Sequence, residues 1–91
     1  MDYMTDNKSP LQFPCPYPLK VMGKNSHEFY AEVSAIIGGH IAEGDEVTYH
    51  SQTSSGDKYI SITATFTARS QEQLNGIYQD LNQHELVVMT L

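Results

Sequence analysis

The sequence has no tryptophan, a single cysteine, few basic residues and no long hydrophobic run. A single cysteine, Cys15, excludes an intrachain disulfide and is typical of proteins in a reducing cytosol. No apolar run approaches the ~20 residues that a membrane helix needs, and the first residues lack the basic and apolar regions of a signal peptide. We therefore expect a cytoplasmic protein that does not associate with a membrane.

The low content of basic residues also bears on the partner. Lysine and arginine number 5 against 11 acidic residues, which gives a formal net charge of −6. Proteins that bind nucleic acids gain affinity by neutralising phosphates with lysine and arginine. The charge therefore disfavours a nucleic-acid partner, and an RNA-binding module is kept only as an alternative function.

A chain of 91 residues has room for one domain. Residues 1–12 are predicted to form a mobile tail, and residues 13–91 a single domain. Alternate prolines from Pro14 to Pro18 favour an extended lead-in to a first strand, which should run from Tyr17 to Gly23. A first helix should begin after Asn25, with Ser26 as a rival N-cap, and end at Gly38-Gly39 through a left-handed glycine.

The second half of the chain repeats this alternation of strand and helix patterns. Val47–Ser51 is predicted as a second strand, Ser54–Asp57 as a hairpin turn, and the residues from Ile60 to Thr67 as a third strand. Ser70 with Gln73 forms a capping box for a second helix. Glu85–Leu91 is the predicted fourth strand, with Val87, Met89 and Leu91 facing inward.

The order of these elements predicts an α+β fold: a ferredoxin-like βαββαβ two-layer sandwich. Right-handed crossovers favour an antiparallel four-stranded sheet of order 4-1-3-2, with two helices on one face. The other face of the sheet should be open.

The motifs identify no chemistry. The four histidines, His27, His40, His50 and His84, lie on different predicted elements without metal-ligand spacing. Cys15 has no base near it in the sequence, and the acidic stretch from Glu43 to Glu46 lacks the alternating oxygens of a calcium loop. We therefore expect no catalytic residue, no metal, no cofactor and no enzymatic activity.

Two candidate surfaces remain. The loop after the first strand has Gly23, and the amides that follow Asn25 and Ser26 at a helix N-terminus suit a small anionic ligand. If these residues only cap the helix, no ligand site follows. The open face of the sheet is the second candidate, because Met22 and Val88 should form an apolar patch there. Its other members are polar or aromatic: Lys20, His50, Tyr59, Ser61, Thr63 and Thr65.

Three segments resemble the YbeD-like family of small uncharacterised bacterial proteins. They are the block from Phe13 to Gly23, the hairpin from Ser55 to Ser61, and the ending Val87-x-Met89-x-Leu91. The resemblance implies a ferredoxin-like sandwich similar to ACT regulatory domains, which bind amino acids, and a proposed role in lipoate metabolism. Because ACT domains often associate side by side, it also implies a dimer through the edge strand, with Thr48, Tyr49 and His50 at the seam.

The sequence thus leaves two main hypotheses of function. The first is a regulatory or adaptor domain that acts by protein–protein contact or self-association, through Lys20, Met22, Thr48, His50, Tyr59 and Val88. The second is a sensor of an amino acid or organic acid that uses Gly23, Asn25 and Ser26.

Overall fold

The computed structural model describes residues 11–91, so most of the predicted tail lies outside the described residues. Its strands are β2 (Cys15–Lys24), β3 (Val47–Thr53), β4 (Tyr59–Ala68) and β5 (Val87–Thr90). Its helices are α1 (His27–Gly38) and α2 (Gln71–Gln83), with a 3-10 turn, η1 (Ser55–Asp57), at the tip of the β3–β4 hairpin. In the part of the chain that is described, no helix is long and apolar enough to cross a membrane.

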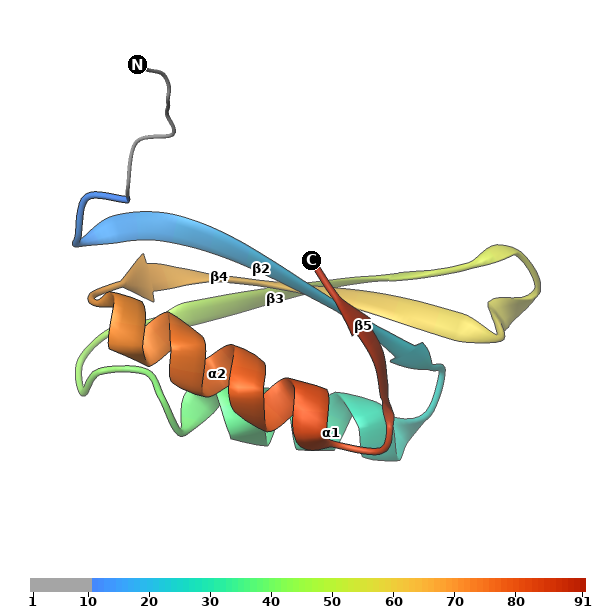
Figure 1. The fold of residues 1–91 in the computed structure, drawn as a ribbon. Helices are drawn as coiled ribbons and strands as arrows, with labels where there is room; N and C mark the ends of the chain where they lie inside the picture. Colours follow the sequence, from blue (N-terminus) through green and yellow to red (C-terminus); the bar gives the residue numbers. More distant parts are fainter. Residues whose placement is uncertain (1–10) are drawn as a thin grey trace, which may run out of the picture.

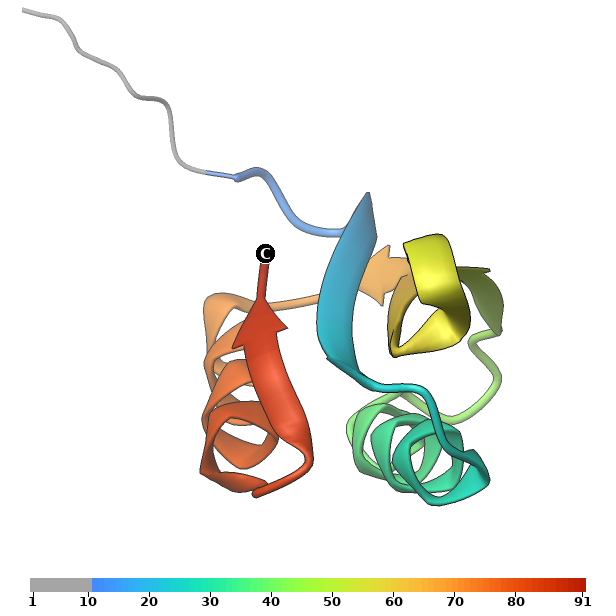
Figure 2. The same ribbon diagram turned by 90° about the vertical axis from the view of Figure 1, so that its right-hand side faces the viewer.

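The four strands form one antiparallel sheet in the order β3-β4-β2-β5. Numbered along the chain and read from the β5 edge, this is the predicted order 4-1-3-2. Both helices lie on one face of the sheet (Figure 1), side by side beneath the strands (Figure 2). The structure confirms the ferredoxin-like α+β sandwich.

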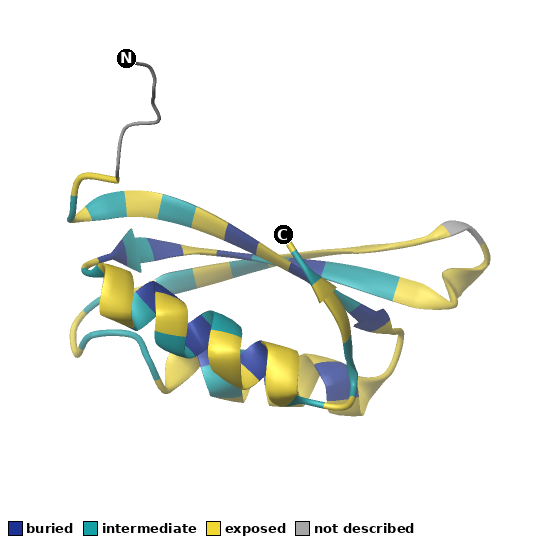
Figure 3. Ribbon diagram, viewed as in Figure 1, coloured by how far each residue is buried: buried dark blue, intermediate teal, exposed yellow. Residues whose placement is uncertain are grey.

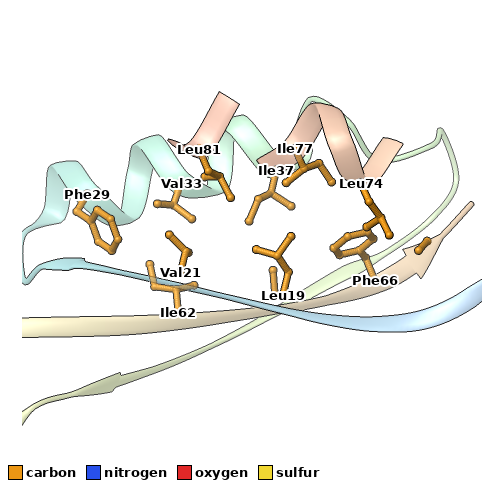
Figure 4. Packing of buried hydrophobic residues seen from close by; sticks show 12 residues of the cluster. Leu19, Val21, Phe29, Val33, Ile37, Ile62, Phe66, Leu74, Ile77 and Leu81 are labelled. Carbon is orange, nitrogen blue, oxygen red and sulfur yellow. The ribbon is translucent and has the colours of Figure 1, made fainter. Parts of the chain in front are cut away.

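The core fills the space between the helices and the sheet (Figure 4). Side chains alternate along β4, so that Ile62, Ala64, Phe66 and Ala68 are buried and the residues between them are not. Buried and exposed residues are interleaved along the helices and along β4 (Figure 3). Each large buried side chain contributes roughly 1.5–3 kcal/mol. The remaining core residues are Leu19, Val21, Phe29, Val33, Ile37, Leu74, Ile77 and Leu81.

β2 begins two residues earlier than predicted, and Pro16 and Pro18 lie inside it. The Lys20 N–H donates to the oxygen of Leu91 at 3.3 Å, and the Lys20 oxygen accepts from the Leu91 N–H at 2.8 Å. Because backbone direction alternates along a strand, Pro16 and Pro18 face the same way as Lys20, away from β4. β5 does not reach that stretch of β2, so the missing proline N–H groups cost no hydrogen bond of the sheet.

The termini of α1 differ from the prediction. Ser26 is the N-cap, because its Oγ accepts from the Phe29 N–H at 3.0 Å. Asn25 instead holds the β3–β4 hairpin: its Nδ2 donates to the oxygen of Asp57 at 3.1 Å. The predicted left-handed glycine is also wrong, because Gly39 has φ −68°, a right-handed conformation. Helix α1 therefore ends without a left-handed residue.

The predicted cap of α2 is present in modified form. Ser70 Oγ accepts from the Gln73 N–H at 3.0 Å. In a capping box the Gln73 side chain would accept from the N–H of Ser70 itself. Here the Gln73 Oε1 accepts from the N–H of the preceding residue, Arg69, at 2.7 Å. The Gln73 Nε2 also donates to the oxygen of His40 at 2.8 Å, which fixes the loop after α1 against α2.

The inward face of the last strand was predicted incorrectly. Val87 pairs with Gly23 and Met89 pairs with Met22, so that Val88 is an extra residue at a β-bulge. The bulge changes which face each later residue occupies. Val87 remains half-buried, whereas Met89 is 46% exposed and Leu91 63% exposed.

Candidate interaction surface

The open face is the side of the sheet turned away from α1 and α2. Residues directly opposite each other on neighbouring strands point to the same side, so the register defines its members. One row runs Gln52, Ser61, Met22, Met89, and the next runs His50, Thr63, Lys20, Leu91. Thr48 lies opposite Thr65, and Tyr59 opposite Lys24. The structure thus brings five of the six predicted surface residues to this face: Lys20, Met22, Thr48, His50 and Tyr59.

Val88, the sixth predicted residue, is exposed but lies at the bulge. It lines a shallow hollow of about 250 Å³ together with Lys24, Glu85 and Leu86. The predicted contact of Val88 with Met22 is replaced by the pair of Met22 and Met89. The apolar part of the open face therefore consists of Met22, Met89 and Leu91, which we call the apolar cluster.

The open face also has a distinct charge. Lys20 and Lys24 lie on either side of Met22 along β2, and within residues 11–91 neither forms an ion pair. None of the face residues defined by the register of the sheet is acidic. The acidic side chains of residues 11–91 are on the helices and the loops: Glu28, Glu32, Glu43, Asp45, Glu46, Asp57, Glu72, Asp80 and Glu85.

The predicted ligand loop has a structural role at all three of its residues. Ser26 caps α1, and Asn25 binds the hairpin. Gly23 is buried, and a Cβ there would overlap the ring of Phe29 and lie 2.5 Å from the oxygen of Leu86. Gly23 is therefore required for close packing of β2 against α1 and the start of β5.

An open hollow of about 320 Å³ nevertheless lies beside this loop. Asn25 and Ser26 line it together with His27, Tyr30 and Ile60. Asn25 and Ser26 have side-chain hydrogen bonds within the fold. His27 contributes an imidazole to the hollow and Tyr30 a phenol.

Two histidines link elements of the fold through carboxylates. His40 Nε2 lies 2.8 Å from Asp80 Oδ2, and His84 Nε2 lies 3.2 Å from Glu32 Oε1, which joins the two helices. Among residues 11–91, no three histidine, cysteine or acidic side chains gather as a metal site would require. Cys15 is half-buried against the core.

The acidic loop is held by one ion pair. Arg69 donates from Nε and Nη2 to the two carboxylate oxygens of Asp45, at 2.7 and 2.8 Å. This hydrogen-bonded arginine holds the pKa of the Asp45 carboxyl below its usual value. The pair fixes the connection between α1 and β3 to the end of β4.

The two edges of the sheet are unequal. At the β3 edge, alternation of the backbone directs the N–H and C=O groups of Val47, Tyr49 and Ser51 away from β4. β3 contains no proline and no charged side chain. At the other edge, Pro16 and Pro18 remove the donors from the part of β2 that β5 leaves open. The β3 edge therefore offers both donors and acceptors to an added strand, whereas this stretch of β2 offers acceptors alone.

Sequence reasoning missed Met89, Leu91 and Lys24 as members of the open face. An apolar run such as Val87-Val88-Met89 has no alternation that reveals a bulge, so its facing could not be read from the pattern. The predicted strand ends at Gly23, which places Lys24 in the following loop, whereas β2 extends to Lys24.

The comparisons with known proteins cover almost the whole chain. The family model "Protein of unknown function (DUF493)" matches residues 8–91. A UPF0250 protein of Chromobacterium violaceum is 37% identical over 97% of this chain and 100% of its own length. A UPF0250 protein of Nitrosomonas europaea is 34% identical over 92% of this chain and 97% of its own.

A solved structure supports the fold independently. The solution structure of protein HP0495 from H. pylori superposes with a TM-score of 0.73 at 18% identity, over 100% of this chain and 98% of that one. The relatives are small bacterial proteins, in agreement with the YbeD-like resemblance of the three sequence segments. By the match to its model and by these relatives, this chain belongs to the DUF493 (UPF0250) family.

Proposed function

We propose that this protein is a small non-enzymatic regulatory or adaptor domain that acts by protein–protein contact through its open face. The observation that carries the proposal is the apolar cluster. Met89 and Leu91 are 46% and 63% exposed beside Met22, on a face that neither helix covers. Exposed apolar side chains that gather in one place mark contact sites more often than single ones do.

The edge of β3 supports the same function. Its outward N–H and C=O groups offer a partner strand, or a second copy of this chain, the hydrogen bonds of an extended sheet. Thr48, Tyr49 and His50 lie along this edge, where the ACT-like resemblance implies a dimer seam. The resemblance also makes an enzyme of lipoate metabolism the first partner to be tried.

Co-purification from the native cell tests the proposal. The full chain is compared with a Met89→Ser, Leu91→Ser variant and with Gln79→Ser, a control on the exposed side of α2. We expect a protein that co-purifies with the wild type and the control but not with the double variant. A protein that light scattering shows to be strictly monomeric, and that retains no partner, would refute the proposal.

The hollow beside α1 favours a small-molecule sensor as a second candidate. Thermal unfolding with amino acids, lipoate and short organic acids tests it. A ligand at 100 times its Kd adds about 2.7 kcal/mol to the free energy of unfolding. If no compound in this set raises the unfolding temperature, the sensor function is excluded for these ligands.

A further inference from the structure

We propose that the open face binds an acidic, apolar segment of another protein, with Lys20 and Lys24 pairing with carboxylates on either side of the apolar cluster. This inference rests on the proposed function and adds the chemistry of the partner to it.

The first argument is the separation of charge within an acidic chain. The formal net charge is −6, yet none of the open-face residues defined by the register is acidic, and Lys20 and Lys24 are on it. The acidic side chains of the described residues lie on α1, on α2 and in the loops. A partner with carboxylates is therefore attracted to the open face and repelled by the rest of the surface.

The second argument is the order of side chains along β2. Lys20, Met22 and Lys24 point to the same side of one strand, so the two lysines are separated by about 13 Å of backbone with an apolar residue midway. Leu91 lies beside Lys20 and Met89 beside Met22, which widens the apolar centre. An extended segment with an acidic, an apolar and an acidic side chain at alternate positions has the matching spacing.

A nucleic acid fits this face less well. Tyr59 and His50 are the two members of the rows defined above that could stack on a base, whereas single-stranded RNA is bound by several stacked aromatic side chains in a positively charged groove. A phosphate backbone would also extend past the two lysines toward the acidic loops. A short acidic segment has only a few carboxylates, and these can all lie beside Lys20 and Lys24.

A second copy of this chain is also a poorer occupant. Its acidic surface is the helical layer, so docking that layer on the open face would join unlike surfaces of the two copies. Such heterologous contacts build rings or open chains of many copies, not a closed pair. A segment of a different protein has no such consequence.

Titrations of the full chain with short peptides, followed by amide NMR shifts, test the inference. The probe peptide has the core Glu-Thr-Leu-Thr-Glu, and its matched controls replace both glutamates by glutamine or by lysine. We expect the acidic peptide to shift the amides of β2 and β5, and the other two to bind more weakly. Lys20→Gln with Lys24→Gln should weaken the acidic peptide about fivefold, while Lys58→Gln on the hairpin should change its affinity by less than about twofold.

The outcomes separate this inference from the proposed function. If the glutamine or lysine peptide binds as tightly as the acidic one, or if an oligouridine RNA shifts the same amides and the acidic peptide does not, the acidic partner is refuted. Co-purification that depends on Met89 and Leu91 would then still support protein contact. Unchanged thermal unfolding of the lysine variants ensures that a loss of binding does not reflect loss of the fold.

Discussion

At the scale of single residues, Gly23 shows that a glycine required for packing can be mistaken for part of a ligand-binding site. A glycine before a helix N-terminus suggests a close approach of a ligand to the backbone, and the structure places the Phe29 ring and the Leu86 oxygen there instead. The sequence could not distinguish the two, because the contact with Leu86 comes from a residue more than sixty positions away in the chain.

Replacement of Gly23 measures this packing. Gly23→Ala should lower the free energy of unfolding by about 1–3 kcal/mol, because an added Cβ overlaps both neighbours. Gly38→Ala is the matched control, since a Cβ there meets nothing within 4 Å, and it should raise stability by about 0.5–1 kcal/mol. Urea denaturation reports both changes. Equal effects of the two substitutions would contradict the packing role.

Tyr78 makes stability depend on pH. Burial, together with the hydrogen bond between the Tyr17 and Tyr78 hydroxyls at 2.8 Å, raises the pKa of Tyr78. A phenol with a raised pKa stabilises the fold fully below its unfolded pKa of about 10, and this contribution is lost as the pH rises through the folded value. Burial also raises the pKa of Tyr49, in the same direction.

The Tyr78→Phe variant isolates this effect. At about pH 8 it should be less stable than the wild type by about 1 kcal/mol, because the Tyr17 hydroxyl loses its partner. Between about pH 8 and pH 11 it should lose less stability than the wild type. Urea denaturation at both pH values provides the test, with Tyr59→Phe on the open face as the control. A variant with the same pH slope as the wild type would contradict the role of Tyr78.

At the scale of elements, local sequence patterns predict which segments form strands and helices. Where an element ends, and which of its side chains face the core, depends on the elements packed against it. The alternation from Ile60 to Phe66 and the Ser70 cap identified β4 and α2 correctly. The facing of β5 could not be predicted, because the bulge is set by its register against Met22 and Gly23. The start of β2 was predicted late because prolines are rare in paired strands, and the sequence does not show where β5 stops.

The prolines of β2 should protect its open edge. Pro16→Thr with Pro18→Thr adds two N–H groups that point away from β4, which completes a template for strand pairing between molecules. We expect this variant to have a higher, concentration-dependent mass than the wild type by analytical ultracentrifugation. Thr67→Val, opposite Pro16 on the same face, is the control because it leaves the edge unchanged. If the double variant sediments as the wild type does at every concentration, the prolines do not protect this edge.

At the scale of the whole molecule, the layers determine which surface is free to act. The order of elements was enough to predict two helices on one face and an open sheet on the other (Figure 1). It was also enough to bring Lys20, Met22, Thr48, His50 and Tyr59 to one side. The apolar cluster was not predictable in full, since Met89 and Leu91 reach the open face only through the bulge.

The charges of the molecule follow the same division. The helical layer and the loops bear the acidic side chains, and the open face bears lysines around apolar residues. This division of charge directs an acidic partner toward the open face and away from the helical layer, as the proposed partner requires.

Photo-crosslinking in the native cell tests most directly whether the open face is the working surface. A photoreactive amino acid is placed at position 89 on β5 or at position 79 on α2, both of which are exposed. We predict that position 89 crosslinks to a discrete protein and that position 79 does not. Crosslinks from position 79 alone, or from neither position, would contradict the assignment of function to the open face.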